Sequence, residues 1–226
     1  MDIIKIKLSD SIHYKESDID LSDIRGTNCY CDDSAMEEIE KRLKDVPLKA
    51  IHFIDSGNYH YMTLPFLKKI KEDFSLVVFD NHTDYKENAY SLIACGGWIK
   101  IAENSFKNLK NIYIIGVDEK LLKEDKFSDK VFTDTKNFLN KIKDEAYPIY
   151  ISIDEDVMTE IDYKANWSQG VMKKEELFSY IEYLFKNKNI IGVDICGGTG
   201  DLYDTKGNEK NQNTENLIVE KINSLI

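Results

Sequence analysis

Five short apolar runs without polar alternation recur along the chain. Such runs are typical of strands that are buried on both faces, whereas half-exposed strands alternate apolar with polar residues. Segments whose apolar residues follow helical spacing separate most of the runs. This order predicts a parallel sheet covered by helices on both faces, and therefore an α/β fold. The runs comprise residues 50–55, 75–80, 111–117, 148–154 and 189–196.

The segments outside these runs carry weaker signals. Residues 1–8 alternate apolar and charged side chains, which indicates a first strand. A helix is expected after Ser34, which can cap it, with Glu37 at the capping-box position. The polar segment 197–213 is predicted to be an exposed loop, and residues 214–226 a closing helix.

Chain length and composition favour one globular domain spanning residues 1–226, since no Pro/Gly/Ser-rich linker divides the sequence. The 42% of hydrophobic residues can fill a core. No apolar run approaches the roughly 18 to 20 residues of a membrane span. A net charge of −11, with the acids spread along the chain, argues against nucleic acid or an anionic membrane as partner.

The N-terminal segment and the cysteines indicate a cytoplasmic protein. Residues 1–8 lack the apolar region and cleavage site of a secretory signal. The four cysteines do not show the spacing of a disulfide scaffold or of a zinc finger. Reduced thiols in a cytoplasm fit this pattern best.

Residues that can bind metal follow the apolar runs. Asp80, His82 and Asp84 occupy every second position after one run, and Asp154 and Asp156 end another. In an extended segment such side chains project to one face. Parallel sheets bind ligands beyond the carboxyl ends of their strands. Imidazole and carboxylate are ligands of divalent cations, so this end of the sheet is predicted to hold metal.

The charge balance of these residues favours two ions. Four carboxylates carry −4, which two divalent cations carrying +4 would cancel, and the neutral imidazoles of His60 and His82 complete the set. Donors dominated by oxygen suit manganese better than a zinc site that prefers thiolates. Two such ions about 3.5 to 4 Å apart can hold a bridging hydroxide and polarise the electrophile that it attacks. This is hydrolytic chemistry.

Less specific interpretations exist for each residue alone. A single histidine after a strand, such as His60, is more often structural or merely exposed, and a single D-x-D is more often part of a turn. Their joint occurrence at three strand ends favours a metal site. His52, inside an apolar run, is predicted to be a core histidine, and His13 receives no functional role.

These residues resemble the metal motifs of the arginase (ureohydrolase) family, which read G-G-D-H, D-A-H-x-D and S-x-D-x-D. The corresponding segments here are Gly57–His60, Asp80–Asp84 and Ser152–Asp156. The resemblance implies a three-layer α/β/α fold with a mostly parallel sheet of about eight strands. It also implies two Mn²⁺ ions and hydrolysis of a guanidino or amidine C–N bond in a small-molecule substrate. The six implied metal ligands are His60, Asp80, His82, Asp84, Asp154 and Asp156, and Asp84 would also orient the attacking hydroxide as a catalytic residue.

The segments that resemble substrate-recognition parts depart from the family pattern. Ala94-Cys95-Gly96 stands where arginases have a His-Gly pair that aids proton transfer. Cys196-Gly197-Gly198 stands where family members place the glutamate that pairs with the guanidinium, unless Asp194 or a nearby acid replaces it. The substrate is therefore expected to differ from arginine. Trp167 and Gln169 are candidate substrate-binding residues, and the alternative is a packed tryptophan followed by a turn glutamine.

Two other functions remain compatible with the sequence. One is a metal-binding protein without catalysis, suggested by the altered recognition segments. The other is a deacetylase-like hydrolase with one zinc ion, although deacetylases use a paired His-His that this chain lacks. Because arginase-family members are often trimers or hexamers, the resemblance also allows a homo-oligomer.

Overall fold

The structure is a computed structural model that describes residues 1–10, 16–87 and 92–226. His13 lies outside the described residues. Within them, eight strands form one large sheet. They are β1 (Asp2–Lys7), β2 (Ile19–Asp20), β4 (Ala50–Phe53), β5 (Phe74–Phe79), β7 (Leu109–Ile115), β8 (Val131–Phe132), β9 (Ile149–Asp154) and β10 (Ile190–Cys196).

The order of strands in this sheet is β2-β1-β4-β10-β9-β5-β7-β8, and every neighbouring pair is parallel. The predicted parallel sheet of about eight strands is confirmed. The edge strands β2 and β8 have two residues each, which is too few to produce a recognisable hydrophobic pattern in the sequence. A separate antiparallel pair joins β3 (Tyr30–Cys31) to β6 (Ile93–Ala94).

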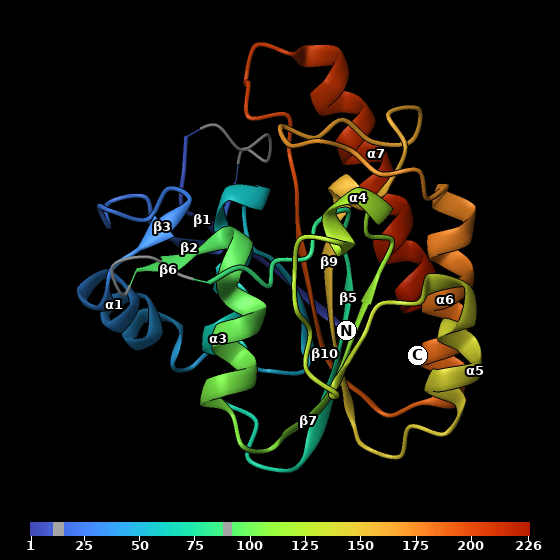
Figure 1. Ribbon diagram of the computed structural model, residues 1–226. Coiled ribbons are helices and arrows are strands. Elements are labelled where there is room, and N and C mark those ends of the chain that lie inside the picture. Colours follow the sequence, from blue (N-terminus) through green and yellow to red (C-terminus); the bar gives the residue numbers. More distant parts are fainter. Residues whose placement is uncertain (11–15, 88–91) are drawn as a thin grey trace.

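Helices cover both faces of the sheet, as Figure 1 shows. One layer contains α1 (Asp33–Leu43), α2 (Thr63–Leu67) and α3 (Trp98–Ser105), and the other contains α5 (Phe138–Lys143), α6 (Lys174–Asn187) and α7 (Thr205–Asn223). A short helix, α4 (Glu119–Leu122), follows β7.

Side chains that alternate along β5 join two different cores. Leu76 and Val78 pack with residues of α1, α2 and α3, whereas Val77 and Phe79 pack with residues of α5, α6 and α7. A strand that contributes to both cores has no polar face, which explains its unbroken apolar sequence. The three-layer α/β/α architecture follows directly from these two cores.

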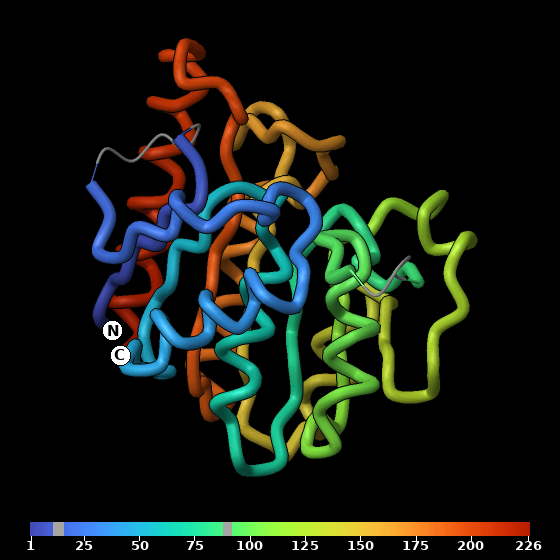
Figure 2. Tube along the Cα trace, turned by 90° about the vertical axis from the view of Figure 1, so that its left-hand side faces the viewer, coloured from blue at the N-terminus to red at the C-terminus, as the bar shows by residue number. Residues whose placement is uncertain are grey.

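The two described ends of the chain lie side by side, as Figures 1 and 2 show. The α-amino group of Met1 donates to Asn223 Oδ1 over 2.8 Å. Among the described residues, every helix is too short or too polar to cross a bilayer.

Two helix boundaries differ from the prediction. Asp32, rather than Ser34, caps α1, because its carboxylate accepts from the Ala35 amide at 2.8 Å. The helix α7 begins at Thr205, so the prediction of a loop over residues 197–213 was wrong for its second half. The polar sequence of that half hid a helix that Asp204 caps.

His52 is a core histidine, as predicted. Its ring is fully buried, stacks on Phe66 at 3.9 Å between centroids, and has Nε2 2.8 Å from the Pro47 carbonyl oxygen. Burial, with a smaller contribution from the Lys69 ammonium, lowers the pKa of His52 to about 4. The folded protein therefore holds this imidazole neutral.

A pH-dependent loss of stability should follow from His52. Because its folded pKa lies below the unfolded value of 6.5, its contribution is complete above pH 6.5 and is lost as the pH falls toward 4. The loss amounts to about 3 kcal/mol. Denaturant unfolding of the protein and of His52→Gln should show a stability difference that shrinks by this amount between pH 7.5 and 4. A constant difference would contradict the prediction.

Candidate metal centre

The sheet register brings the acids of two strands together. Phe79 on β5 pairs with Ile153 on β9, so Asp80 and Asp154, one residue further along each strand, are neighbours. Asp156 lies in the 3₁₀ turn Glu155–Val157, which follows β9 directly. The amide of Asp156 donates to Asp154 Oδ1 at 3.0 Å. Three of the four predicted carboxylates thus meet at the carboxyl end of the sheet, where α/β folds bind ligands.

His60 reaches this end from the 3₁₀ segment Gly57–Met62, which follows β4. Its Nε2 lies 2.9 Å from Ser152 Oγ, and that hydroxyl donates to Asp194 Oδ1 at 2.5 Å. Since the serine proton goes to Asp194, the serine oxygen accepts from Nε2–H. The other ring nitrogen, Nδ1, then carries a lone pair directed at the acids, as a metal-binding histidine requires.

This arrangement also decides the role of Asp194. The carboxyl group is fully buried and accepts a hydrogen bond from Ser152. Burial raises the pKa of Asp194 to about 6. Asp194 is absent from the cavity lining, and its hydrogen bond to Ser152 places it to orient the imidazole of His60.

His82 approaches the acids from the opposite side. Its Nδ1 lies 2.8 Å from Asp156 Oδ2 and 3.5 Å from Asp80 Oδ1. Its Nε2 lies 2.8 Å from Ser168 Oγ, which holds the ring with Nδ1 turned inward. His60 and His82 therefore present the same ring nitrogen to the shared carboxylate of Asp80.

Asp84 completes the group in an unusual backbone conformation. Its φ of +43° lies in the left-handed region, which short polar residues tolerate best. The carboxylate Oδ2 lies 3.0 Å from His60 Nδ1 and accepts from Trp98 Nε1 at 2.8 Å. A strained backbone at such a place is common where function fixes a side chain.

Five of the six predicted ligands form two overlapping clusters that share Asp80. One contains His60, Asp80 and Asp84, the other Asp80, His82 and Asp156; within each, one ligand atom per residue lies within 4.8 Å of the others. Asp154 Oδ2 lies 3.6 Å from His60 Nδ1. Distances of this order suit atoms that surround an ion at about 2 Å.

Buried atoms without hydrogen bonds mark the same place. Within the described part of the chain, His60 Nδ1, Asp80 Oδ2 and Asp156 Oδ2 are buried and lack a hydrogen-bond partner. Such atoms are rare and costly unless a ligand or ion satisfies them. The donor types and the unpartnered atoms together fit a pair of divalent cations.

The electrostatics of the clusters also demand positive charge. Burial, together with the nearby Asp80 carboxylate, raises the pKa of Asp154 to about 7. Burial lowers the pKa of His82, but the carboxylates of Asp156 and Asp80 outweigh this effect and raise it to about 11. Carboxylates packed this closely stabilise any cation among them, whether a proton or a metal ion.

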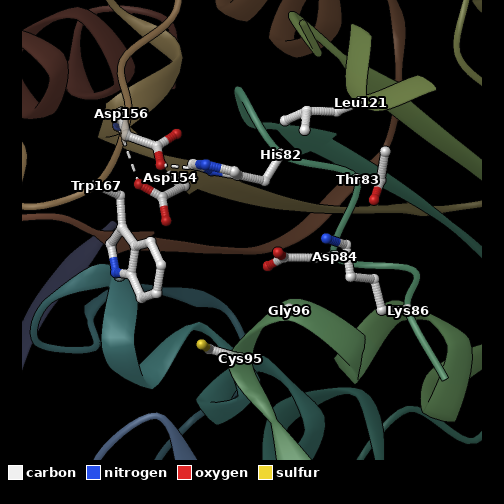
Figure 3. Close-up of a pocket in the computed structure, with 11 residues that line it drawn as sticks. His82, Thr83, Asp84, Lys86, Cys95, Gly96, Leu121, Asp154, Asp156 and Trp167 are labelled. Atoms are coloured by element: carbon white, nitrogen blue, oxygen red, sulfur yellow. Dashed lines mark hydrogen bonds and ion pairs between the residues drawn. The ribbon is translucent and has the colours of Figure 1, made fainter. Parts of the chain in front are cut away.

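A cavity of about 130 Å³ opens onto this group. Figure 3 shows the side chains of Asp154, Asp156 and His82 pointing toward one another, with Trp167 beside them. The Trp167 indole donates from Nε1 to Asn58 Oδ1 at 2.9 Å and meets the His82 ring edge-on. Trp167 thus forms one wall of the cavity.

Gln169 occupies the turn rather than the cavity. Its Nε2 donates to the carbonyl oxygens of Met158 and Tyr163, and its Oε1 accepts from the Ala165 amide. Both ends of the amide are thus satisfied inside the loop that carries Trp167. The structure supports the turn alternative for this residue.

The altered recognition segments have distinct surroundings. Cys95 lines the cavity at the place where arginases carry His-Gly. Gly197 has φ +159°, and a Cβ there would lie 2.7 Å from Tyr163 Oη and 2.8 Å from Glu155 Oε2. That position has no room for the glutamate side chain of the family pattern.

Sequence reasoning missed the residues that support the ligands. Trp98 was not predicted to contact the site, because a buried tryptophan at the start of a helix looks like ordinary core. Ser152 begins the motif Ser152–Asp156, but no role was predicted for it. A serine two positions before a ligand aspartate, on the same strand face, is a signal that could have identified it.

The structure is an α/β/α protein with ligand-type residues at the carboxyl end of a parallel sheet, where α/β proteins bind their ligands. The arginase family profile matches residues 4–222. The chain belongs to the arginase family, whose members are hydrolases acting on C–N bonds.

The chain is also similar to individual known proteins and structures. An uncharacterized protein of Thermotoga maritima is 33% identical over 147 residues, 65% of this chain and 57% of that protein. Formimidoylglutamase of Bacillus subtilis superposes with a TM-score of 0.66 at 16% identity, covering 98% of this chain and 87% of that one. A putative agmatinase of Clostridium difficile gives 0.65 at 21%, covering 84% and 71%. At these identities the structures show the fold alone.

Proposed function

We propose that this protein is a metal-dependent hydrolase with two ions, which cleaves a C–N bond of a small guanidino or amidine compound other than arginine. The observation that carries the proposal is the pair of clusters sharing Asp80, with unpartnered ligand atoms in both. His60, Asp84 and Asp154 would complete one position, and His82, Asp154 and Asp156 the other. Two divalent cations held there would supply an activated water at neutral pH and polarise the substrate.

The residues around the ions have separate tasks. Asp84 lines the cavity with one carboxylate oxygen held by Trp98, so it can orient the attacking water and take up its proton. Ser152 keeps His60 in the tautomer that binds metal. Trp167 forms the wall along which a planar amidine can stack.

The cavity walls support a substrate other than arginine. Among the described lining residues, the acids are Asp84, Asp154 and Asp156, all proposed as metal ligands, and Lys86 contributes a cation. A bound guanidinium would find no free carboxylate to pair with. Each missing charge-assisted hydrogen bond weakens binding by about 1.5 to 3 kcal/mol. Compact neutral or anionic amidines should therefore bind better than arginine.

Manganese and a cytoplasmic location belong to the same proposal. All six proposed ligands offer carboxylate oxygen or imidazole nitrogen, which suits a hard divalent ion. All four cysteines are free, which supports a reducing compartment.

The test is hydrolysis by manganese-loaded protein of a panel that includes arginine, agmatine, formimidoylglutamate and simple amidines. Release of urea, ammonia or formamide from at least one compound is expected, with arginine among the poorest substrates. If a compound of the panel is hydrolysed, Trp167→Leu should raise the KM for that compound more than it lowers kcat. Metal-loaded protein that turns over no member would leave metal binding without catalysis as the function.

Replacing Trp98 by Phe should lower kcat by about 10- to 100-fold. The change removes the Nε1 hydrogen bond to the Asp84 carboxylate, and a hydrogen bond to a charged group contributes about 1.5 to 3 kcal/mol. Steady-state kinetics should show the loss in kcat while KM stays near the original value. The chain's other tryptophan provides the control, since Trp167→Phe should leave kcat nearly unchanged. Equal kcat values for both variants would contradict this role of Trp98.

A further inference from the structure

Cys196 lies inside the candidate metal centre although no motif includes it. It ends β10 in direct register with Asp154 at the end of β9. Paired residues on neighbouring parallel strands project to the same face of the sheet. The sulfur lies 3.3 Å from Asp154 Oδ2, and the side chain is 1% exposed. The thiol therefore faces the same enclosed space as the carboxylate.

A second atom points into that space. His60 Nδ1, Asp154 and Cys196 Sγ form a cluster in which the three ligand atoms lie within 4.8 Å of one another, and all three residues are buried. His60 Nδ1 lacks a hydrogen-bond partner among the residues that the structure describes. An unpartnered imidazole nitrogen beside a thiol and a carboxylate is the donor set of a soft divalent ion.

We infer that Cys196 supplies a sulfur ligand on the His60 side of the centre, so that this position selects zinc, cobalt or iron(II) over manganese. The inference rests on the metal centre of the proposed function, and it assigns a different metal to one of the two positions. When the metal–sulfur bond forms, the S–H bond breaks, sulfur keeps the electron pair and the proton leaves to solvent. The His82 side has nitrogen and oxygen donors and keeps its preference for a harder ion.

A different role for the thiol would leave the metal preference unchanged. The Sγ–H group could only donate to Asp154 Oδ2 and orient that carboxylate. In that case the sulfur would remain outside bonding distance of the ion. The two roles differ in a measurable distance, since a zinc–sulfur bond is about 2.3 Å long.

Zinc-edge X-ray absorption on the full-length protein loaded with one zinc per chain measures this distance. One sulfur scatterer at about 2.3 Å is expected for the unaltered protein. The same scatterer should be missing in Cys196→Ser, which keeps the size of the side chain. A zinc shell of nitrogen and oxygen alone in the unaltered protein would overturn the inference without any variant having to fold.

Cys95→Ser is the matched control, because Cys95 also faces the cavity but lies outside the cluster. It should keep the sulfur scatterer. In competition between zinc and manganese, Cys196→Ser should lose about 10- to 100-fold in zinc affinity and about threefold or less in manganese affinity. Loss of the scatterer in Cys95→Ser, or equal losses for both metals, would overturn the assignment.

The outcome is separable from that of the hydrolase proposal. A sulfur scatterer in a protein that cleaves no compound of the panel supports the ligand and contradicts the hydrolase. Hydrolysis by a protein whose zinc shell contains no sulfur supports the hydrolase and contradicts the ligand.

Discussion

Replacing Asp80 by Asn is expected to release both metal ions and to lower kcat/KM by about three orders of magnitude, or about 4 kcal/mol of transition-state stabilisation. Asp80 Oδ2 lies 3.3 Å from His60 Nδ1, and Oδ1 lies 3.5 Å from His82 Nδ1. Each oxygen thus serves one position. An amide keeps the shape but offers one oxygen and no negative charge. Metal content by mass spectrometry and hydrolysis of the best panel substrate measure the two effects.

The neighbouring acids provide a graded comparison. Asp84 belongs only to the cluster of His60, and Asp156 only to that of His82. Asp84→Asn and Asp156→Asn should therefore each retain about one ion per chain, whereas Asp80→Asn retains about none. Asp129, an exposed carboxylate, is the control, and its Asn variant should keep both ions. Two ions retained by Asp80→Asn would refute a centre that shares this residue.

The sequence predicted the fold and the meeting of the acids because both depend on local patterns. Unbroken apolar runs reflect strands with a core on each face, and such strands must be parallel and flanked by helices. Parallel strands end at one edge, so the acids were expected there, and Asp80 lies next to Asp154 because β5 pairs with β9. His60 depends in addition on a turn after β4, and its place was predicted from motif order.

The roles of Cys196 and Trp98 depended on information that the sequence does not display. Cys196 meets Asp154 because β10 pairs with β9 in a particular register, and strand order cannot be read from apolar runs. Trp98 reaches Asp84 across 14 positions because the chain returns through a turn with Gly96 and Gly97. Position alone does not distinguish such a tryptophan from a core residue.

The wrong loop prediction at α7 and the turn position of Gln169 share one physical cause. Residues of the first half of α7 are polar, yet Asn211 is fully buried, donates to the Lys164 carbonyl oxygen and accepts from the Lys164 amide. Gln169 likewise satisfies backbone groups of its loop. Polar side chains that replace missing backbone partners resemble exposed or ligand-binding residues in the sequence, because composition does not show where their hydrogen bonds go.

Removal of metal with a chelator is expected to lower the Tm by about 10 to 20 °C. An ion at 100 times its Kd stabilises the fold by about 2.7 kcal/mol, so two ions contribute about 5 kcal/mol. For a domain of this size each kcal/mol corresponds to about 2 to 4 °C. Five of the six proposed ligands are buried, and the ligands join β5, β9 and the turn that carries His60. Thermal scans with manganese or zinc, before and after chelation, measure the shift.

The Asp80→Asn variant separates this effect from any direct action of the chelator. Because that variant should bind almost no metal, its Tm should be the same with and without chelator. The shift in the unaltered protein should also narrow as the pH falls, since protons compete with metal for the imidazoles and carboxylates. If the chelator lowers the Tm of both proteins equally, or changes the Tm of neither, a structural contribution of the ions is contradicted. A shift confined to the unaltered protein would mean that Asp80 joins the two sides of the centre into one cooperative unit of the fold.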